Sequence, residues 1–186
     1  NLSTEQPYYE KTYELDTKIQ GININDKNVD VSLSPSADGK IRVNYYENEK
    51  NYYDIREENG TLIIDKKVSV NLLDMFFNIS FFTPILSLEV PADFDGDITL
   101  KSSNANVKVS NVSVKSGTFT TSNNKINIED CSFSQVITTE SSNSTIEIQR
   151  VDVKGKIYCR TSNSRLVLKN ISCQSLEGST NNGYLG

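Results

Sequence analysis

The stretch TESSNSTIEI, residues 139–148, places Asn143 between a serine-rich corner and an alternating apolar pair, Ile146 and Ile148. Four other stretches of the C-terminal half share this arrangement: LKSSNANVKV (100–109), FTTSNNKINI (119–128), CRTSNSRLVL (159–168) and GSTNNGYL (178–185). We call the aligned asparagine the marker asparagine. The markers are Asn104, Asn123, Asn143, Asn163 and Asn182, spaced 19, 20, 20 and 19 residues apart. A fixed period near 20 residues is the signature of a stacked array.

Apolar side chains keep constant offsets from the marker asparagine. They recur at +3 and +5, at +8 and +10, and at −6, where Gly117 is the exception. Apolar and polar residues alternate within each unit, and this period of 2 indicates strands. Strands this short bury a face only by stacking on the next turn. We therefore predict a parallel β-solenoid with three short strands in each turn and a roughly triangular cross-section.

The marker asparagine has a structural role in this prediction. Asparagine tolerates the left-handed backbone region better than most residues, and a tight corner requires that region. Stacked asparagines also bond to one another through their side-chain amides. We therefore expect a corner ladder formed by Asn104, Asn123, Asn143, Asn163 and Asn182. The alternative is that this Ser-Asn row is a polar binding stripe.

The N-terminal half shows less regular strand patterns. Residues 22–24, 29–33, 41–43 and 62–64 alternate or run apolar between turn signals such as Glu58-Asn59-Gly60. We expect an irregular antiparallel or mixed cap over residues 1–96 and regular repeats over 97–186. Because no Pro/Gly-rich linker separates the halves, residues 1–186 are expected to form one domain.

Composition narrows the possible functions. The chain has 186 residues, a net charge of −5 and no histidine, so the commonest general base and metal ligand is missing. The charge is divided unevenly: residues 1–96 hold 17 acids and 9 bases, whereas residues 97–186 hold 7 acids and 10 bases. An acidic chain argues against nucleic-acid binding. No apolar run is long enough for a transmembrane helix.

A search for catalytic chemistry gives no catalytic, cofactor-binding or metal-ligating candidate. Stacking the turns at +4, +6 and +9 places no two acids in one column, and charges of opposite sign alternate, as on a solvated face. The segment Asp93–Asp97 resembles a calcium loop but lacks its downstream glutamate, so we interpret it as a turn. Cys131, Cys159 and Cys173 occupy inward positions and are expected to be small buried hydrophobes. We expect no cofactor and no enzymatic activity.

Two features could contact a partner. Tyrosines occur in pairs, Tyr45-Tyr46 and Tyr52-Tyr53 among them, and one residue of each pair is expected in the core because adjacent strand residues face opposite ways. The stretch 72–86 is the most apolar in the chain and contains Phe76, Phe77, Phe81 and Phe82. It is either a core element at the solenoid end or a surface for self-association or membrane contact.

These motifs resemble the bacterial putative-adhesin family, a β-strand-repeat family of unknown function. The resemblance rests on Gly96-Asp97-Ile98, on the Ser-Asn corners and on the closing stretch TNNGYL at residues 180–185. The N-terminal strands KIRVNYY (40–46) and GTLII (60–64) are similar too. The resemblance implies a β-repeat fold and adhesion, and it assigns no catalytic residue.

We accordingly expect a non-enzymatic adhesin or cell-envelope binding module that recognises an unidentified glycan or protein. The expected location is the cell envelope or the extracellular space, with any signal or anchor outside this stretch of sequence; a cytoplasmic location is the alternative. The chain could instead be a structural or regulatory interaction scaffold that associates through the Phe-rich segment, or a polysaccharide-acting enzyme. The enzyme hypothesis rests on analogy with β-helices of known activity alone.

Overall fold

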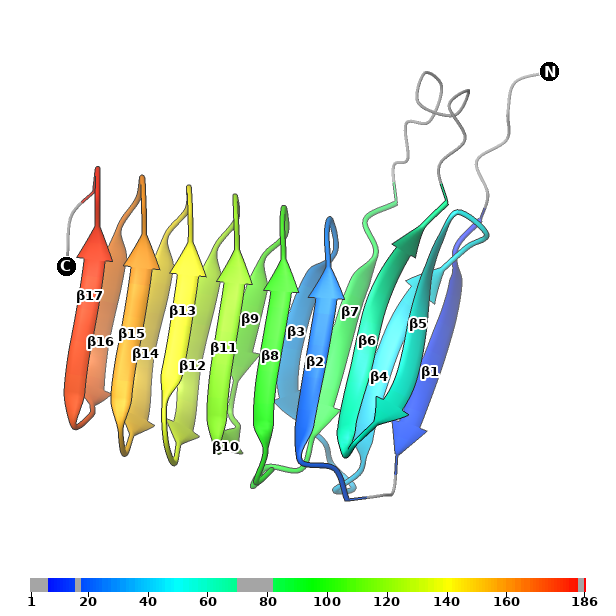
Figure 1. The fold of residues 1–186 in the computed structure, drawn as a ribbon, viewed down its shortest axis with the longest axis horizontal. Helices are drawn as coiled ribbons and strands as arrows, with labels where there is room; N and C mark the ends of the chain where they lie inside the picture. The colour runs from blue at the N-terminus through cyan, green and yellow to red at the C-terminus, as the bar shows by residue number, and fades with distance from the viewer. Residues whose placement is uncertain (1–6, 16–17, 70–81, 184–185) are drawn as a thin grey trace.

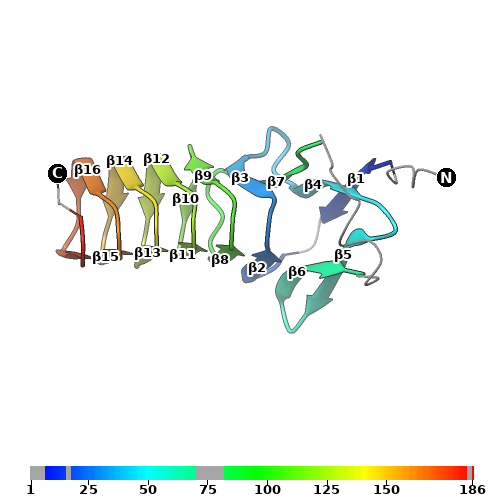
Figure 2. The same cartoon turned by 90° about the horizontal axis from the view of Figure 1, so that it is seen from above.

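The computed structural model describes residues 7–15, 18–69, 82–183 and 186. Within these residues the chain is all β and contains no helix. The strands stack side by side in two sheets that face each other along the long axis of the molecule (Figure 1, Figure 2). The predicted β-solenoid is therefore confirmed.

Each turn of the C-terminal half contributes to both sheets. The eight-stranded sheet takes the residues before the marker, in β8 (Asp97–Ser102), β11 (Ser116–Thr121), β13 (Ile137–Ser141), β15 (Lys156–Thr161) and β17 (Ser175–Thr180). The nine-stranded sheet takes the residues after it, in β9 (Val107–Ser110), β10 (Ser113–Val114), β12 (Ile126–Phe133), β14 (Ile146–Val153) and β16 (Leu166–Ser172). These strands pair in parallel with like positions opposite each other, so that Ile126, Ile146 and Leu166 lie in one row.

The expected triangular cross-section is wrong, because the last two apolar segments of a turn belong to one sheet. Strand β12 runs without a break through Asp130, whose φ is 54°. This left-handed residue shifts the alternation of side chains, so that Ile128 and Cys131 are both buried although three positions separate them. The same +7 column has positive φ in four successive turns, at Asn111, Asp130, Arg150 and Asn170.

The marker asparagines lie at the opposite corner, where the chain passes from one sheet to the other. None of them has a positive φ, so the left-handed conformation expected there is wrong; it lies at +7 instead. Their side-chain amides form a continuous ladder. The Nδ2 of Asn123 donates to Oδ1 of Asn104 at 2.6 Å, and the bonds continue to Asn143, Asn163 and Asn182 at 2.8, 2.7 and 2.8 Å.

A second ladder lies beneath these asparagines. Two residues before each marker, a serine or threonine hydroxyl donates to a backbone carbonyl of the preceding rung. Thr121 Oγ1 donates to the carbonyl of Ala105 at 3.1 Å, and Thr161 Oγ1 donates to that of Ser144 at 3.3 Å. Because a buried hydroxyl needs a partner, this column satisfies its own polar groups while it joins the rungs.

The N-terminal half contains a further rung that the repeat search missed. Strands β2 (Gly21–Asp26) and β3 (Asp30–Pro35) flank Asn28, whose Oδ1 accepts a bond from Asn104 Nδ2 at 2.9 Å. The +3 and +5 positions of Asn28 are Val31 and Leu33, both buried, as in the other rungs. The rung lies between β8–β9 and β6–β7, although the chain visits it before β6 and β7.

The remaining strands form the predicted mixed cap, which is confirmed. They are β1 (Tyr9–Leu15), β4 (Ile41–Glu47), β5 (Asn51–Glu58), β6 (Thr61–Val68) and β7 (Ile85–Val90). The pairs β1–β4, β4–β7 and β5–β6 are antiparallel. The outermost strands β1 and β5 carry charges such as Glu10, Lys11 and Arg56, which disfavour pairing with another chain.

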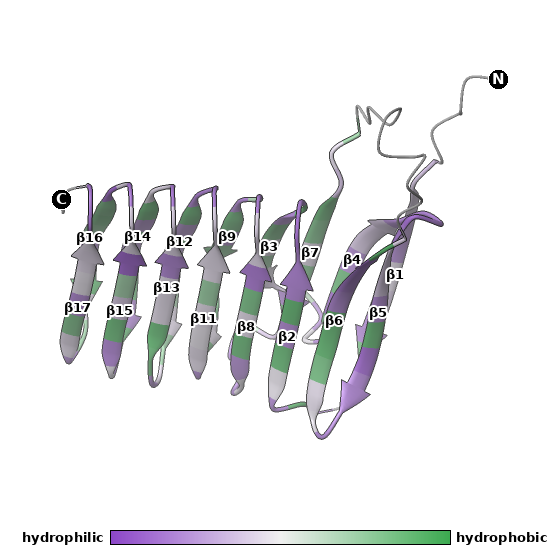
Figure 3. Cartoon of the chain, turned by 45° about the horizontal axis from the view of Figure 1, so that its top comes forward, coloured by the Kyte–Doolittle hydropathy of each residue, from purple (hydrophilic) through white to green (hydrophobic). Residues whose placement is uncertain are grey.

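Apolar bands alternate with polar ones along the strands and face the space between the sheets (Figure 3). Gly117 breaks the apolar −6 column for a steric reason. A Cβ at this position would lie 2.5 Å from Cε2 of Phe119 and 2.9 Å from Cε1 of Phe133. The two rings, with centroids 6.4 Å apart, fill the volume that Ile137 and its neighbours fill in the next rung. One small and two large residues thus conserve the core volume.

We expect the substitution Gly117→Ile to destabilise the fold by about 1–3 kcal/mol or more through overpacking. Phe119→Thr alone should leave a cavity and also destabilise it. The double variant reproduces the pair Ile137 and Thr139 of the next rung, and it should be more stable than either single variant. Urea unfolding measures all three; a double variant no more stable than the more stable single variant would contradict the volume argument.

The asparagine ladder gives a second prediction. Asn143→Ala removes one donated and one accepted amide bond and should lower the free energy of unfolding by about 1 kcal/mol, since each exposed bond contributes a fraction of that. Asn124→Ala is the matched control, because the Asn124 side chain makes no hydrogen bond in the described structure. Equal losses for the two variants in urea unfolding would show that the ladder adds nothing.

Candidate functional site: an open groove over β13, β15 and β17

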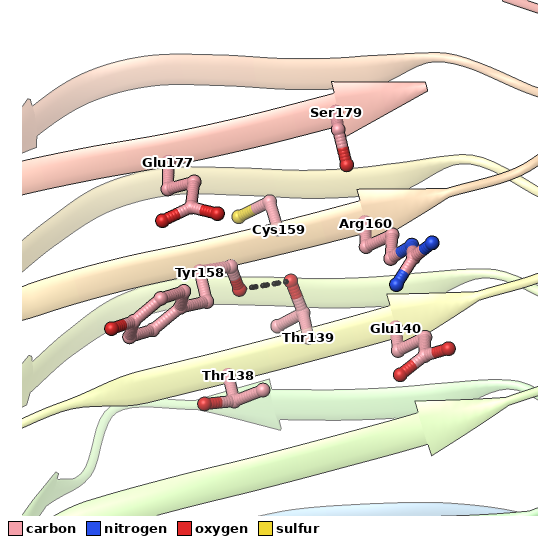
Figure 4. A pocket seen from close by; sticks show the side chains of 8 residues that line it. All are labelled: Thr138, Thr139, Glu140, Tyr158, Cys159, Arg160, Glu177 and Ser179. Atoms are coloured by element: carbon pink, nitrogen blue, oxygen red, sulfur yellow. Dashed lines mark hydrogen bonds between the residues drawn. The ribbon is translucent and has the colours of Figure 1, made fainter. Parts of the chain in front are cut away.

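An open groove of about 580 Å³ lies on the outer face of the eight-stranded sheet. Its side chains come from three neighbouring strands, β13, β15 and β17 (Figure 4). The lining residues are Thr138, Thr139, Glu140, Tyr158, Cys159, Arg160, Glu177 and Ser179. The groove lies on the sheet face, so backbone pairing between rungs continues beneath it.

Two outward columns of the repeat form the groove. The −5 column holds threonine at Thr99, Thr118 and Thr138, then changes to Tyr158 and Glu177. The −3 column holds Lys101, Thr120, Glu140, Arg160 and Ser179. Strand alternation points both columns away from the core. The chemistry of this face therefore changes from threonine-rich to aromatic and charged at its C-terminal end.

Tyr158 is the aromatic wall of the groove, with 39% of its surface exposed. The ammonium of Lys156 lies 4.1 Å from the centroid of its ring, a cation–π contact. The same Nζ donates to Oε2 of Glu177 at 2.9 Å. Both partners raise the pKa of Lys156, the Glu177 hydrogen bond more strongly than Tyr158. Because Lys156 does not line the groove, it holds the ring in place without entering the hollow.

Glu140 and Arg160 form the other wall. They are opposite each other in the register between β13 and β15, and both are exposed. Within the described part of the chain neither side chain makes a hydrogen bond or an ion pair, although their strands are adjacent. A guanidinium and a carboxylate are thus available to a ligand on the same side of Tyr158 (Figure 4).

The two side chains at the floor of the groove, Thr139 and Cys159, are buried and offer no reactive group. Thr139 Oγ1 donates to the backbone carbonyl of Tyr158 at 3.3 Å. Cys159 is buried, and burial raises the pKa of its thiol to about 11. A thiol with such a pKa is a poor nucleophile at neutral pH. Cys131 is buried likewise and has its pKa raised to about 11, chiefly by desolvation, while Cys173 is half-buried; all three are free.

Sequence reasoning missed the groove because it stacked only the columns on the opposite sheet. There the structure pairs charges along the face: Lys108 contacts Glu129 at 3.6 Å, and Lys169 contacts Glu147 at 3.8 Å. The available signal was the −5 column, in which Tyr158 ends a run of three threonines. Strand alternation already places this column beside −3, but the tertiary structure was needed to show that a hollow lies over the two columns.

Only some of the aromatic residues that were predicted to contact a partner are exposed. Tyr45 and Tyr53 are buried in the core with ring centroids 5.4 Å apart, so they cannot contact a partner. The ring centroids of Tyr46 and Tyr8 each lie 5.2 Å from the ring centroid of the exposed Phe82. Tyr52 is exposed at the far end of the molecule. Phe76, Phe77 and Phe81 lie outside the described residues.

The acidic clusters of the N-terminal half are engaged by arginines. Arg56 bonds to Asp54 at 2.7 Å and to Asp65 at 3.0 Å. The expected turn is seen at Ala92 and Asp93, where the Phe94 amide donates to the Pro91 carbonyl at 3.1 Å, and Asp97 already begins β8. Among the described residues no group of three histidine, cysteine or acidic side chains is placed to hold a metal ion.

One buried ionisable cluster lies at the junction between the cap and the first rung. Asp26 occupies the column that is serine or threonine in the other rungs, and Tyr53 Oη donates to it at 2.5 Å. Burial raises the pKa of Asp26, against the opposing effects of Tyr53, the Lys27 amide and Lys66. Desolvation also raises the pKa of Tyr53 and lowers the pKa of Lys66, whose Nζ lies 4.4 Å from the Tyr53 centroid.

Comparison with known proteins finds a matching family. The family described as Toastrack DUF4097 matches residues 19–185, which confirms the resemblance drawn from the corner motifs. No curated protein matches the chain. Among the described residues no helix is long and apolar enough to span a membrane.

Three solved structures are similar at low identity. A putative cell adhesion protein from Clostridium sporogenes is 12% identical with a TM-score of 0.38, over 97% of this chain and 100% of that one. A putative adhesin from Bacteroides fragilis is 11% identical with a TM-score of 0.39, over 97% of both chains. A putative adhesin from Parabacteroides merdae is 11% identical with a TM-score of 0.31, over 96% of this chain and 95% of that one.

The Asp26 cluster predicts an unusual pH dependence. A carboxyl whose pKa is raised by folding contributes stability below its unfolded pKa, and that contribution is lost as pH rises through the folded pKa. The variant Asp26→Asn has no carboxyl at this position, so it does not lose this stability as pH rises. The stability of the variant relative to the parent should therefore increase from about pH 4 to about pH 7 in urea unfolding.

Asp38→Asn is the control of opposite sign. Hydrogen bonds from Arg42 and the Lys40 amide lower the pKa of Asp38, so its contribution is present above the unfolded pKa. The relative stability of this variant should fall over the same range. Parallel pH curves for the two variants would contradict the assignment of Asp26.

Proposed function

The chain belongs to the Toastrack DUF4097 family, and from that premise we propose that it is a non-enzymatic binding module of the cell envelope, of the adhesin type. The observation that carries the proposal is the groove over β13, β15 and β17. It combines an exposed aromatic ring with a carboxylate and a guanidinium that have no partner among the described residues. Exposed aromatic and arginine side chains are typical of binding surfaces.

The solenoid suits presentation of such a surface. Backbone pairing and two side-chain ladders connect each regular rung to its neighbours. Successive side chains of each outward column are therefore held one rung apart, at a spacing of about 4.8 Å. A groove built on strands keeps its side chains in place more accurately than one built on loops. We infer that the rod holds the groove in a fixed geometry toward a glycan or a protein outside the cell.

The chemistry of the groove supports binding rather than catalysis. Its thiol, Cys159, is buried with its pKa raised to about 11. Its carboxylates, Glu140 and Glu177, are exposed on an open face, where nothing keeps water from the reacting atoms. A polysaccharide-acting enzyme would need two carboxyl groups fixed on either side of the scissile bond. The enzyme hypothesis retains only its analogy with β-helices of known activity.

An interaction scaffold is the second candidate, and the aromatic contacts of Phe82 favour it. Phe82, which belongs to the Phe-rich stretch 72–86, is 44% exposed and contacts Tyr8 and Tyr46. Exposed apolar clusters mark association surfaces. Such a scaffold would associate through the cap end of the molecule, inside the cell or on the inner face of the envelope.

Location distinguishes the two candidates. Intact cells that express the full-length protein are treated with a protease and, in parallel, with a membrane-impermeant lysine reagent. Mass spectrometry then follows peptides from residues 97–186, which include the exposed Lys125 and Lys154. We expect release or labelling from intact cells. Lysed cells are the control for access to the folded rod.

Protection in intact cells with modification after lysis would overturn the envelope proposal and leave the interaction scaffold. The lysine reagent is included because a folded solenoid resists proteases; labelling does not require the chain to open.

A further inference from the structure

We propose that the groove over β13, β15 and β17 binds an uncharged glycan, a disaccharide or longer, stacked on Tyr158. This inference rests on the proposed function and names the ligand class of its site. It follows from three properties of the groove: the exposed aromatic ring, the balance of charge and the position on a sheet face.

The ring of Tyr158 is prepared for stacking. Lys156 contacts it from outside the groove and is itself held by Glu177, so the ring loses little freedom when a ligand binds. A pyranose presents C–H groups on its flat face, and an aromatic face attracts such weakly positive groups. The groove face of Tyr158 therefore suits the apolar side of a sugar ring.

The charges of the groove and of Lys156, which lies beside it, sum to zero. Arg160 and Lys156 are positive, and Glu140 and Glu177 are negative. An acidic ligand would approach two carboxylates, and a basic ligand would approach two cations, so neither gains a net attraction. Hydroxyl groups both donate and accept. They can bond to Glu140 and Arg160 together, and charge-assisted bonds of this kind are the stronger ones.

The position of the groove argues against an extended peptide. Peptides that add to a sheet use the free hydrogen-bonding edge of a strand. Strands β13 and β15 are each paired on both sides, so over these two strands the groove offers side chains only, and β17 alone of the three lies at the end of the sheet. From β13 to β17 the groove crosses two rung spacings, about 10 Å, which is longer than one sugar ring. The ligand is therefore an oligosaccharide.

Calorimetry with the full chain tests the proposal, using neutral oligosaccharides from cellulose, mannan and xylan, and acidic ones from polygalacturonate and hyaluronan. We expect a neutral oligosaccharide to bind. Tyr158→Ala should weaken that binding by about tenfold or more, and Tyr158→Phe by much less because it keeps the ring. Tyr52→Ala is the matched control: Tyr52 is 42% exposed, similar to Tyr158, but lies on β5.

Glu140→Gln tests the charge argument separately. Together with Lys156 beside it, the groove then carries a net positive charge, so this variant should gain affinity for the acidic oligosaccharides while Tyr158→Ala does not. Thermal melting by circular dichroism shows whether each variant is folded. Binding of acidic oligosaccharides by the parent chain, binding of peptides that depends on Tyr158, or absence of binding to every neutral probe would overturn the inference. None of these results decides the envelope location, which the labelling of intact cells tests independently.

Discussion

Parallel pairing in register between successive rungs is the constraint on which the rest of the molecule depends. Each inner strand of the regular rungs bonds to the rung before it and the rung after it, so its side chains stack on the residues about 20 positions away. Core columns must therefore match in volume, and polar columns must supply their own partners. The asparagine and hydroxyl ladders meet the second requirement, and Gly117 with Phe119 and Phe133 meets the first by compensation.

The same constraint explains where a binding site can develop. Inward columns and corners are fixed by packing and hydrogen bonding, whereas outward columns are free to change from rung to rung. On the eight-stranded sheet the −5 column changes from threonine to Tyr158, and the −3 column changes to Glu140 and Arg160. A local change on a rigid face yields a groove without altering the fold. The proposed recognition of an uncharged glycan depends on these few outward positions.

The N-terminal half shows how the solenoid ends without an exposed repeat. The first rung, β2 and β3, lies between the cap and β8–β9, although the chain forms it first. Two residues before its asparagine this rung has Asp26, where the other rungs have serine or threonine, and Tyr53 from the cap donates a hydrogen bond to Asp26. A carboxylate accepts more bonds than a hydroxyl, so one residue can satisfy a cap side chain and the local backbone together. The antiparallel strands β1 and β5 then close the two sheets with charged edges.

The sequence alone determined the solenoid, its period and the positions of the marker asparagines, because stacking imposes the same offsets on every rung. It left open the first rung at Asn28, which one isolated copy of the pattern cannot reveal. The two-sheet cross-section could not be predicted either, because the left-handed residues at Asp130 and its equivalents keep two successive strand segments in one sheet. Only the tertiary structure showed that Tyr45 and Tyr53 are the buried members of their pairs. It alone showed that a hollow lies over Tyr158, Glu140 and Arg160 and that the last two make no ion pair within the described residues, because the sequence does not fix the conformations of exposed side chains.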